Sequence, residues 1–545
     1  MPGRKFIFIA ASDSVGQSSI GRSGAQLFRR TVFPTSLLFQ GRFRNIMEMI
    51  NHFHHGSFFA EAGAGLRPRL LHPHGLPALS GLLLGGYLDS NGIQCEIINH
   101  FDSESERFVR LYEQSDPAPI VGLSSTYHLS WSSLRQITSR LRAINQDMKI
   151  ISGGALYPNL IAGGDAAAQW EPRMRELGLD AVFTALNSEF DLLAYLRAAA
   201  DDRKLADVPN LAWFDSTGQF RVNGPVWRSP YLAAPAGNWS ALNLPRASQT
   251  IQLRTAVGCP YRCSFCTFPV MSHGLHKMTE EAVSATLMEA KKNFKNLKRV
   301  AFTDDTFNSD PARFQRLCEL IAAQGLQWFA YIRPQFVTRQ IARHMRDCGC
   351  LGVFLGLESA NQKMLDIMNK KTKIAHMAAG VEHLGREGIL THGSFFLGFP
   401  GETRTTARQT RQYILNSGLA SYSIMPYTYY PSAVPESLRN HYGLQGSTNY
   451  DWRHKTMDST EAVTLVEDIF KTVISPVAMM PSGTWHLVSM MDAGFNWAEI
   501  SALQTFFNKI TADQMDGRWA EPHPALADFA EVASRAKRRI ENDGS

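Results

Sequence analysis

Short apolar runs alternate with longer amphipathic stretches through the first 205 residues of the chain. A compact apolar run is typical of a buried strand, and apolar positions three or four residues apart are typical of a helix. The pattern predicts strands at Phe6–Ala10, Cys95–Ile98, Ile120–Leu123, Ile150–Ile151 and Ala181–Phe183, and helices that include Leu79–Leu88 and Ser133–Ile144. This alternation favours an α/β fold with a doubly wound parallel sheet.

A second alternation of strands and helices runs from residue 251 to about residue 430. Its predicted strands are Ile251–Val257, Arg299–Phe302, Gly352–Leu357 and Ser394–Leu397. A repeated parallel unit of this kind predicts a partial or full (β/α) barrel, in which chemistry takes place at the carboxyl ends of the strands.

The chain of 545 residues is too long for a single core, so we expect several domains. Residues 1–70 should complete a first domain that spans 71–205. Residues 206–250, rich in Pro, Asn, Ser and Trp, predict a linker to the barrel at 251–430. Residues 431–545 are mainly helical in pattern, apart from a polar stretch at Asn440–Asp458 that predicts a loop.

Composition excludes several classes of protein. The net charge of +6 is mild and no block of Lys and Arg is long, which argues against nucleic-acid binding. No apolar run approaches the ~20 residues needed to span a bilayer, and the apolar stretch near the N-terminus is too short for a signal peptide. An odd number of cysteines, 7, argues against a disulfide framework. We therefore expect a protein of the reducing cytoplasm.

Cys259, Cys263 and Cys266 form a C-x-x-x-C-x-x-C run directly after a predicted strand. Three thiolates at this spacing can hold three irons of a [4Fe–4S] cluster and leave the fourth iron open to a small molecule. A structural zinc site would need a second Cys or His pair at defined spacing, and none lies nearby. Phe265, next to the third cysteine, could pack against a bound adenine.

Polar and small residues follow the predicted barrel strands, where ligands would bind. They are Asp304 and Asp305 in FTDDTFNSD, Glu358 and Ser359 in GLESA, and Gly398, Pro400 and Gly401 in SFFLGFPGET. Helix capping and a simple tight turn are the alternative interpretations for the acidic segment and the glycine turn.

Three further residues are candidates for substrate contact. Arg333 and Gln335, in YIRPQF, form a polar pair at a predicted strand end. A guanidinium could grip a carboxylate or a phosphinate through two parallel hydrogen bonds, or form a structural ion pair, and both interpretations stay open. Tyr427 follows the last predicted strand, where it lines a pocket or packs between the barrel and the C-terminal helices.

The strand ends of the first domain carry small and polar residues instead. Ser124, Ser125, Thr126, Tyr127 and His128 follow one strand, Gly153 and Gly154 follow the next, and Glu189 lies beyond the last. Paired glycines let a bulky ligand approach the backbone closely. The absence of G-x-G-x-x-G after the first strand argues against a dinucleotide site.

The cysteine run and Phe265 resemble the signature of the radical S-adenosylmethionine superfamily. The resemblance implies that S-adenosylmethionine binds the open iron through its amino and carboxylate groups. Reductive cleavage, with an electron from a flavodoxin- or ferredoxin-type donor, then yields a 5′-deoxyadenosyl radical. Glu358 would hold ribose hydroxyls and the Gly-Phe-Pro-Gly turn would contact the adenine.

The first domain resembles the cobalamin-binding domain that precedes many of these cores. HGLP at 74–77, GLSST at 122–126 and SGG at 152–154 carry the resemblance, and Glu189 matches the position of a Gly-Glu-rich turn. The motif D-x-H-x-x-G, which supplies a His ligand to cobalt, does not occur. The implied cofactor is therefore a cobalamin whose lower face lacks that ligand.

EIINHFDSESERF, FTDDTFNSDPARF, CGCLGVFLGLES, GSFFLGFPGET and DWRHKTMDSTEA together resemble the cobalamin-dependent (class B) P-methyltransferases of phosphinothricin biosynthesis. The resemblance implies methyl transfer from methylcobalamin to a small-molecule substrate radical, here a phosphinate, in antibiotic biosynthesis. Methylation of an aromatic or unactivated carbon, as in tryptophan or a peptide, and a non-methylating oxidoreductase or cyclase stay open. Arg453, His454 and Lys455 could bind an anionic substrate or form a solvated turn.

Overall fold

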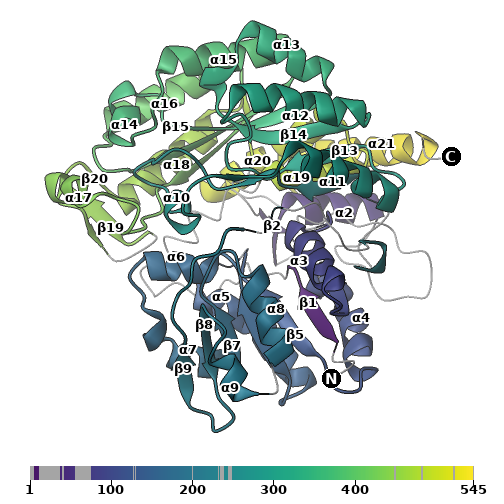
Figure 1. Cartoon of the computed structure of the whole chain (residues 1–545). Helices are drawn as coiled ribbons and strands as arrows, with labels where there is room; N and C mark the ends of the chain where they lie inside the picture. Colours follow the sequence, from purple (N-terminus) through teal and green to yellow (C-terminus); the bar gives the residue numbers. More distant parts are fainter. Residues whose placement is uncertain are drawn as a thin grey trace.

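The computed structural model describes residues 5–11, 37–39, 42–55, 75–126, 128, 130–198, 201–230, 232, 239–242, 248–446, 450–479, 483–518 and 522–543. Two sheets with their helices form the lower and upper parts of Figure 1. His74 and Tyr127, which the sequence analysis singled out, lie outside the described residues.

The first sheet has the strand order β4-β1-β5-β6-β7-β8-β9. Its strands are β4 (Cys95–Ile98), β1 (Phe6–Ile9), β5 (Ile120–Ser124), β6 (Lys149–Gly153), β7 (Ala181–Phe183), β8 (Leu211–Phe214) and β9 (Phe220–Val222). The first five run parallel, and their order reverses direction at β1, as in a doubly wound sheet. The flanking helices are α3 (Leu79–Ser90), α4 (Phe101–Glu113), α5 (Trp131–Ile144), α6 (Leu156–Ala162), α7 (Glu171–Leu177) and α8 (Glu189–Ala198). The predicted fold class is confirmed.

β8 and β9 correct one expectation, because they lie within the predicted linker. β8 pairs antiparallel with β7 and then with β9, so residues 211–222 extend the first sheet. The stretch is short and rich in turn residues, so its sequence carries little periodicity. Residues 211–222 form strands because β8 can pair with the edge of β7.

The second sheet is wholly parallel and has the order β10-β13-β14-β15-β16-β17-β21. Its strands are β10 (Thr250–Leu253), β13 (Arg299–Phe302), β14 (Gln327–Ile332), β15 (Cys350–Glu358), β16 (Leu390–Leu397), β17 (Ser421–Pro426) and β21 (Val477–Ala478). The helices between and after them are α11 (Glu280–Asn293), α12 (Pro311–Ala323), α13 (Arg339–Asp347), α14 (Gln362–Ile367), α15 (Ile374–Arg386), α16 (Arg404–Asn416) and α18 (Ser459–Thr472). In the described chain β10 and β21 do not pair with each other, so the barrel is partial.

The predicted strand Ile251–Val257 is in fact two strands. β10 ends at Leu253, and β11 (Ala256–Val257) pairs antiparallel with β12 (His276–Lys277). The chain leaves the sheet between them because Thr255 turns to Asp304, whose carboxylate accepts hydrogen bonds from the Thr255 amide and hydroxyl.

The C-terminal region is mainly helical, with α19 (Gly483–Asp492), α20 (Trp497–Met515) and α21 (Ala525–Asp543). These helices share an apolar cluster with β2 (Leu37–Phe39) and α2 (Ile46–His55). β2 and α2 therefore pack on the C-terminal helices, whereas β1 alone of the described N-terminal segment joins the first sheet. Within the predicted loop 440–458, β18 (Gln445–Gly446), β19 (Trp452–His454) and β20 (Met457–Asp458) form a small antiparallel sheet.

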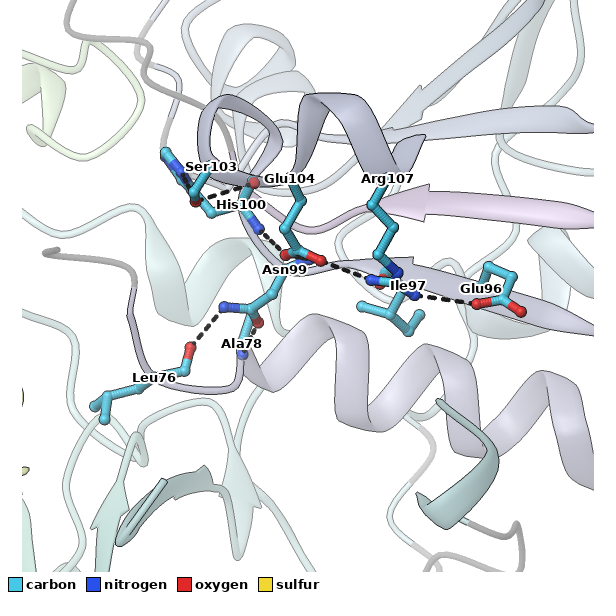
Figure 2. Close-up of polar contacts among 9 residues, drawn as sticks. All are labelled: Leu76, Ala78, Glu96, Ile97, Asn99, His100, Ser103, Glu104 and Arg107. Carbon is cyan, nitrogen blue, oxygen red and sulfur yellow. Dashed lines mark hydrogen bonds and ion pairs between the residues drawn. The ribbon is translucent and has the colours of Figure 1, made fainter. Parts of the chain in front are cut away.

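A polar network closes the carboxyl end of β4 (Figure 2). The Asn99 amide accepts a hydrogen bond from the Ala78 amide at 2.7 Å and donates one to the Leu76 carbonyl at 3.0 Å, which ties the start of α3 to the sheet. The Glu104 carboxylate accepts hydrogen bonds from the backbone N–H of Asn99 and from the Arg107 guanidinium. This network lies in EIINHFDSESERF, so that part of the family resemblance has a structural role.

The two sheets are also joined by apolar packing. α3 packs against β10 and against the short 3-10 helix Trp239–Leu242, so closely that a Cβ on Gly85 would lie 2.8 Å from the Leu242 side chain. Among the described residues, no helix is both long enough and apolar enough to cross a membrane.

Candidate active site

The cysteine run lies on the loop after β11, at the carboxyl edge of the partial barrel. Gly258, which precedes it, has a φ of +93°, and a Cβ there would lie 1.8 Å from the Gly274 carbonyl oxygen. Only glycine satisfies both the left-handed backbone and the close approach of the β11–β12 hairpin. The turn aims the loop Cys259–Cys266 away from the sheet.

The three thiols of the run are free and partly buried. The Cys259 Sγ lies 3.4 Å from the Thr306 hydroxyl, and the Cys263 Sγ accepts a hydrogen bond from Arg333 at 3.3 Å. Burial raises the pKa of Cys263, against the opposing charges of Lys370 and Arg333, and burial raises the pKa of Cys266 to about 12. Thiols that resist ionisation become thiolates when a metal binds them.

The donor set fits an iron–sulfur cluster with an open iron. Within the described chain, no three His, Cys, Asp or Glu side chains gather closely enough to hold a single metal ion. A cluster of several irons needs its thiolates further apart than a single ion does, and soft thiolate donors select iron–sulfur clusters. The three cysteines could therefore hold such a cluster.

A short segment after α14 clasps the cysteine loop. The Ser264 amide donates to the Met368 carbonyl at 2.9 Å, and the Asn369 side chain donates to the Arg262 carbonyl at 2.7 Å. Asn369 and Lys371 both have a positive φ, at 52° and 55°. Such strained conformations persist only where surrounding contacts fix them, so the clasp holds the loop in one conformation.

Glu358 and Lys370 form a buried ion pair beside the cysteine loop. The Lys370 Nζ lies 2.7 Å from the Glu358 carboxylate, and it lies 5.8 Å from the centroid of the Phe265 ring. Glu358 has a φ of 66°, at an irregularity in the pairing of β15 with β16. Ser359 is fully buried and accepts a hydrogen bond from the Asn361 amide, which is a turn contact. Glu358 and Lys370 offer both charges to an amino acid or ribose group.

Lys370 was not singled out in the sequence analysis. It lies in NKKTK, where a run of basic residues usually indicates a solvated turn. Its burial depends on Glu358, 12 residues away, and no local pattern in the sequence signals that pairing.

Asp304 and Asp305 have different environments. Asp304 is buried and bonded to Thr255, and burial raises its pKa to about 6. Its place is structural, contrary to the expectation that it faces a cofactor. Part of the Asp305 side chain is exposed to solvent. Nearby protein atoms nevertheless remove water from its carboxyl, and this desolvation, together with the charge of Asp304, raises its pKa to about 7. Asp305 is the carboxylate of this segment that a ligand can reach.

Arg333 lies directly after β14 (Gln327–Ile332), at the strand end that the sequence predicted. Its guanidinium donates to Cys263 and to the Lys370 carbonyl at 2.8 Å, and it lies over the Tyr261 ring at 3.4 Å from the centroid. These contacts direct Arg333 to the cysteine loop. Gln335 is half-buried in the turn that follows, and its Nε2 has no hydrogen-bond partner among the described residues.

The Gly-Phe-Pro-Gly turn is shaped by packing. Gly398 and Gly401 have φ values of +99° and +98°, and a Cβ on Gly398 would lie 2.3 Å from the Trp452 ring. The His454 ring bonds the Gly398 carbonyl at 3.1 Å. Pro400 is buried within this turn. The tight turn therefore requires glycine at Gly398 because DWRHKTMDSTEA packs on it.

Aromatic contacts connect this turn to the cysteine loop. The Phe265 ring lies 5.0 Å from the Phe396 ring and 6.4 Å from the Phe399 ring, between centroids. Tyr427 packs against Phe399 and Trp452 and is 2% exposed, which is the packing role that the sequence left open. A function for Tyr427 in catalysis stays a prediction.

Two basic residues of β19 and the following turn make local contacts within the small sheet and with α17 (Glu436–Tyr442). Arg453 donates to the Gln445 side chain at 2.9 Å, and Lys455 donates to the His441 carbonyl at 2.7 Å. Both are exposed. In this arrangement the small sheet presents neither side chain to the cysteine loop, so these contacts give no support to substrate binding.

Glu402, in the same GFPGET segment, was quoted in the sequence but given no role. Its carboxyl is fully buried and accepts a hydrogen bond from the Thr406 hydroxyl. Burial raises its pKa to about 7. The sequence signal was present in the motif, but a Glu that precedes a helix is usually exposed.

The first domain faces the barrel with a small, neutral edge. Gly154 has a φ of +119°, and a Cβ there would lie 2.9 Å from the Ser125 hydroxyl. The Ser125 Oγ is buried and has no hydrogen-bond partner among the described residues. Ser124 donates to Thr126 at 3.0 Å, and Gly153 leaves room beside Phe183. This edge fits a bulky ligand that supplies a partner to Ser125.

Two polar contacts join the first domain to the cysteine loop. Thr267, next to Cys266, donates to Asn159 of α6 at 2.9 Å. Arg254, at the end of β10, donates to Glu189 at 3.1 Å. These contacts join α6 and the start of α8 to the barrel side, with α6 and α10 (Phe268–Met271) between the sheets in Figure 1.

A cavity of about 650 Å³ opens beside this junction. It is lined by α5, α6 and α7 of the first domain and by Tyr430 of the barrel side. His128 lines it and is hydrogen-bonded to Ser133 at 3.2 Å. Burial lowers the pKa of His128 to about 4, so its ring is neutral at pH 7. The volume is that of a small-molecule site.

Comparison with known proteins identifies the barrel. Residues 253–414 match the family model of the Radical SAM superfamily. The chain is 30% identical over 184 residues to the bacteriochlorophyllide d C-12(1)-methyltransferase of Chlorobaculum tepidum, covering 32% of this chain and 40% of that one. It is 29% identical over 328 residues to an uncharacterized methyltransferase of Pyrococcus horikoshii, covering 56% and 65%. The chain thus spans less than two thirds of the length of either relative.

The whole arrangement is similar to a solved structure. The radical S-adenosylmethionine methyltransferase TsrM of Kitasatospora setae, solved with cobalamin and a [4Fe–4S] cluster, matches 86% of this chain and 97% of its own, with a TM-score of 0.58 and 15% identity. At that identity the likeness concerns the fold. The segment that matches the Radical SAM family model, residues 253–414, therefore follows a doubly wound α/β domain.

Proposed function

We propose that the chain is a cobalamin-dependent radical S-adenosylmethionine methyltransferase. In this proposal residues 71–205, with β1, hold cobalamin. Residues 251–430 hold the [4Fe–4S] cluster and S-adenosylmethionine, and residues 431–545 support the barrel. The observation that carries it is the meeting of the cysteine loop with the small, neutral edge of the first domain, joined by Thr267–Asn159 and Arg254–Glu189.

In this proposal different residues of the barrel hold the cluster and S-adenosylmethionine. Cys259, Cys263 and Cys266 hold the cluster, and the clasp at 368–372 fixes their loop. Glu358 and Lys370 orient S-adenosylmethionine, with Phe265 against the adenine. When bound, these cofactors supply a 5′-deoxyadenosyl radical and a transferable methyl group.

On the opposite side, Ser125, Gly153 and Gly154 make room for the corrin and its tail. Asp305 lies where a ligand can reach it and, with a pKa raised to about 7, can hold or accept a proton near neutral pH. In this proposal the two cofactors bind on opposite walls of one site.

We further propose a small-molecule phosphinate as substrate, methylated at phosphorus, and a low-potential one-electron donor protein as partner in a reducing cytoplasm. The resemblance of DWRHKTMDSTEA and the other quoted segments to phosphinothricin-type P-methyltransferases supports it. The second candidate is methylation at carbon. It is favoured by the relative from Chlorobaculum tepidum, whose name specifies a carbon position.

The test is anaerobic reconstitution of the full chain with iron, sulfide and hydroxocobalamin, followed by turnover with an N-acetylated phosphinate amino acid. 5′-Deoxyadenosine and S-adenosylhomocysteine are quantified together by mass spectrometry. Near-equal, substrate-dependent yields of both products are expected.

The outcomes separate the alternatives. Both products with tryptophan or a peptide but not with the phosphinate would establish carbon methylation. 5′-Deoxyadenosine without S-adenosylhomocysteine would overturn methyl transfer in favour of a cyclase or oxidoreductase. A chain that binds neither iron nor cobalamin would overturn the proposed function.

A further inference from the structure

We propose that Arg333 is a positioning residue that raises the reduction potential of the iron–sulfur cluster by acting on the sulfur of Cys263. The inference rests on the proposed function, since it requires that the three thiols hold a cluster. It gives Arg333 a task different from the grip on a substrate anion that the sequence suggested.

Three contacts, two from the cysteine loop and one from the segment after α14, fix the plane of the Arg333 guanidinium. One Nη donates to the Cys263 Sγ at 3.3 Å, and the other donates to the Lys370 carbonyl at 2.8 Å. The Tyr261 ring stacks on the guanidinium, with 3.4 Å from its carbon to the ring centroid. The side chain is buried, so water does not compete for these contacts.

The backbone of Arg333 is fixed as well. Asn308 accepts a hydrogen bond from the Arg333 amide and donates one to its carbonyl, both at 2.9 Å. Asn308 lies in the segment after β13, so two neighbouring strand ends hold Arg333 at the position from which it reaches the cysteine loop. A long side chain held at both ends keeps its charge at a constant distance from the sulfur.

The charge of Arg333 is not neutralised by a carboxylate. In the described part of the chain, no Asp or Glu forms an ion pair with it. Lys370, the other cation that acts on Cys263, is paired with Glu358 at 2.7 Å. Arg333 is therefore the uncompensated positive charge against this sulfur.

The direction of the effect follows from the charge change. In the reduction, a low-potential donor loses one electron and the cluster site gains it, and no bond forms or breaks. The site becomes more negative by one unit. A fixed cation and an N–H donor on a ligand sulfur stabilise that added charge, and hydrogen bonds to the sulfurs are among the factors that set the potentials of such clusters.

The experiment compares Arg333→Gln and Arg333→Lys with the wild-type chain, all reconstituted anaerobically without S-adenosylmethionine. Iron and sulfide per chain are measured first, and the midpoint potential is then determined by redox titration with electron paramagnetic resonance. Arg343→Gln serves as the control, because Arg343 is 53% exposed on α13 and pairs with Glu387. It removes the same charge from the same domain.

We expect Arg333→Gln to keep its cluster and to shift the midpoint to a more negative potential. Arg333→Lys should shift it less in the same direction, because lysine retains the charge but lacks the planar fork. Arg343→Gln should match the wild type. If Arg333→Gln assembles no cluster, the midpoint potential of Arg333→Lys tests the inference instead.

A full cluster with a wild-type midpoint in the Arg333 variants would overturn the inference. An equal shift in Arg343→Gln would overturn it too, since the effect would then be one of general charge. Failure of the proposed function has a different signature, a wild-type chain that assembles no cluster.

Discussion

The two walls of the candidate site differ in chemistry, although both are carboxyl edges of parallel strands. The barrel wall carries ionisable groups, among them three thiols and the buried pair of Glu358 and Lys370. The wall of the first domain carries small neutral groups, Ser125 and Gly154 above all. One wall supplies donor atoms, and the other supplies space. The same architecture therefore offers a place for a metal cluster and a place for a large planar cofactor.

The largest effect is expected when one cysteine of the barrel wall is removed. Cys263→Ala should reduce the iron and sulfide content to near zero and 5′-deoxyadenosine formation to background, because two cysteines remain for three irons. Cobalamin binding should persist, since the other wall is untouched. Cys318→Ala is the control, a buried cysteine of α12 in the same domain. Full cluster content in Cys263→Ala would contradict the assignment of the ligands.

The buried ion pair tests how far the barrel wall depends on charge. Lys370→Met should lower the free energy of unfolding by about 3–5 kcal/mol, because it leaves the Glu358 carboxylate buried without a partner. The double variant Glu358→Gln with Lys370→Met should lose less than the sum of the two single variants. Thermal unfolding of the four proteins measures this. Additive losses would show that the two side chains act independently.

The buried carboxyl of Glu402, on the barrel side, should make the stability of the protein depend on pH. Its pKa is raised from 4.5 to about 7 in the folded protein. Between those values the unfolded chain ionises first, so this group lowers stability as the pH rises, and the loss is complete above pH 7. Glu402→Gln removes that loss.

We expect Glu402→Gln to be more stable than the wild type by roughly 3 kcal/mol at pH 8 and no more stable near pH 4.5. The difference should therefore grow as the pH rises through this window. Thermal unfolding midpoints at a series of pH values check it. The exposed Glu436→Gln is the control. A difference that shrinks as the pH rises would contradict the assigned cause.

The smallest expected effect tests the neutral wall. Gly154→Ala should weaken cobalamin binding by ~10-fold, about 1.4 kcal/mol, because the new Cβ meets Ser125 and strains a left-handed backbone. Cluster content should be unchanged. Gly218→Ala is the matched control, since Gly218 also has a positive φ, at +79°, but a Cβ there meets nothing within 4 Å. Equal cobalamin affinity in both variants would argue against this wall as the cobalamin site.

The sequence by itself predicted the α/β architecture and the three cysteines as candidate ligands. Both follow from local information: apolar runs specify strands, and the three thiols lie within one loop of eight residues, 259–266, so their proximity needs no distant partner. Strand order in the chain then placed Asp305 and Glu358 at one edge, because parallel strands end on the same side.

Only the tertiary structure decided what the remaining residues contact. Arg333 meets Cys263 across 70 residues of chain, and His454 meets Gly398 across 56. β8 and β9 joined the first sheet because β7 offered a free edge, and β2 and α2 joined the C-terminal helices through apolar packing. Contacts between distant segments depend on how the whole chain folds. The pattern within one short segment does not contain that information.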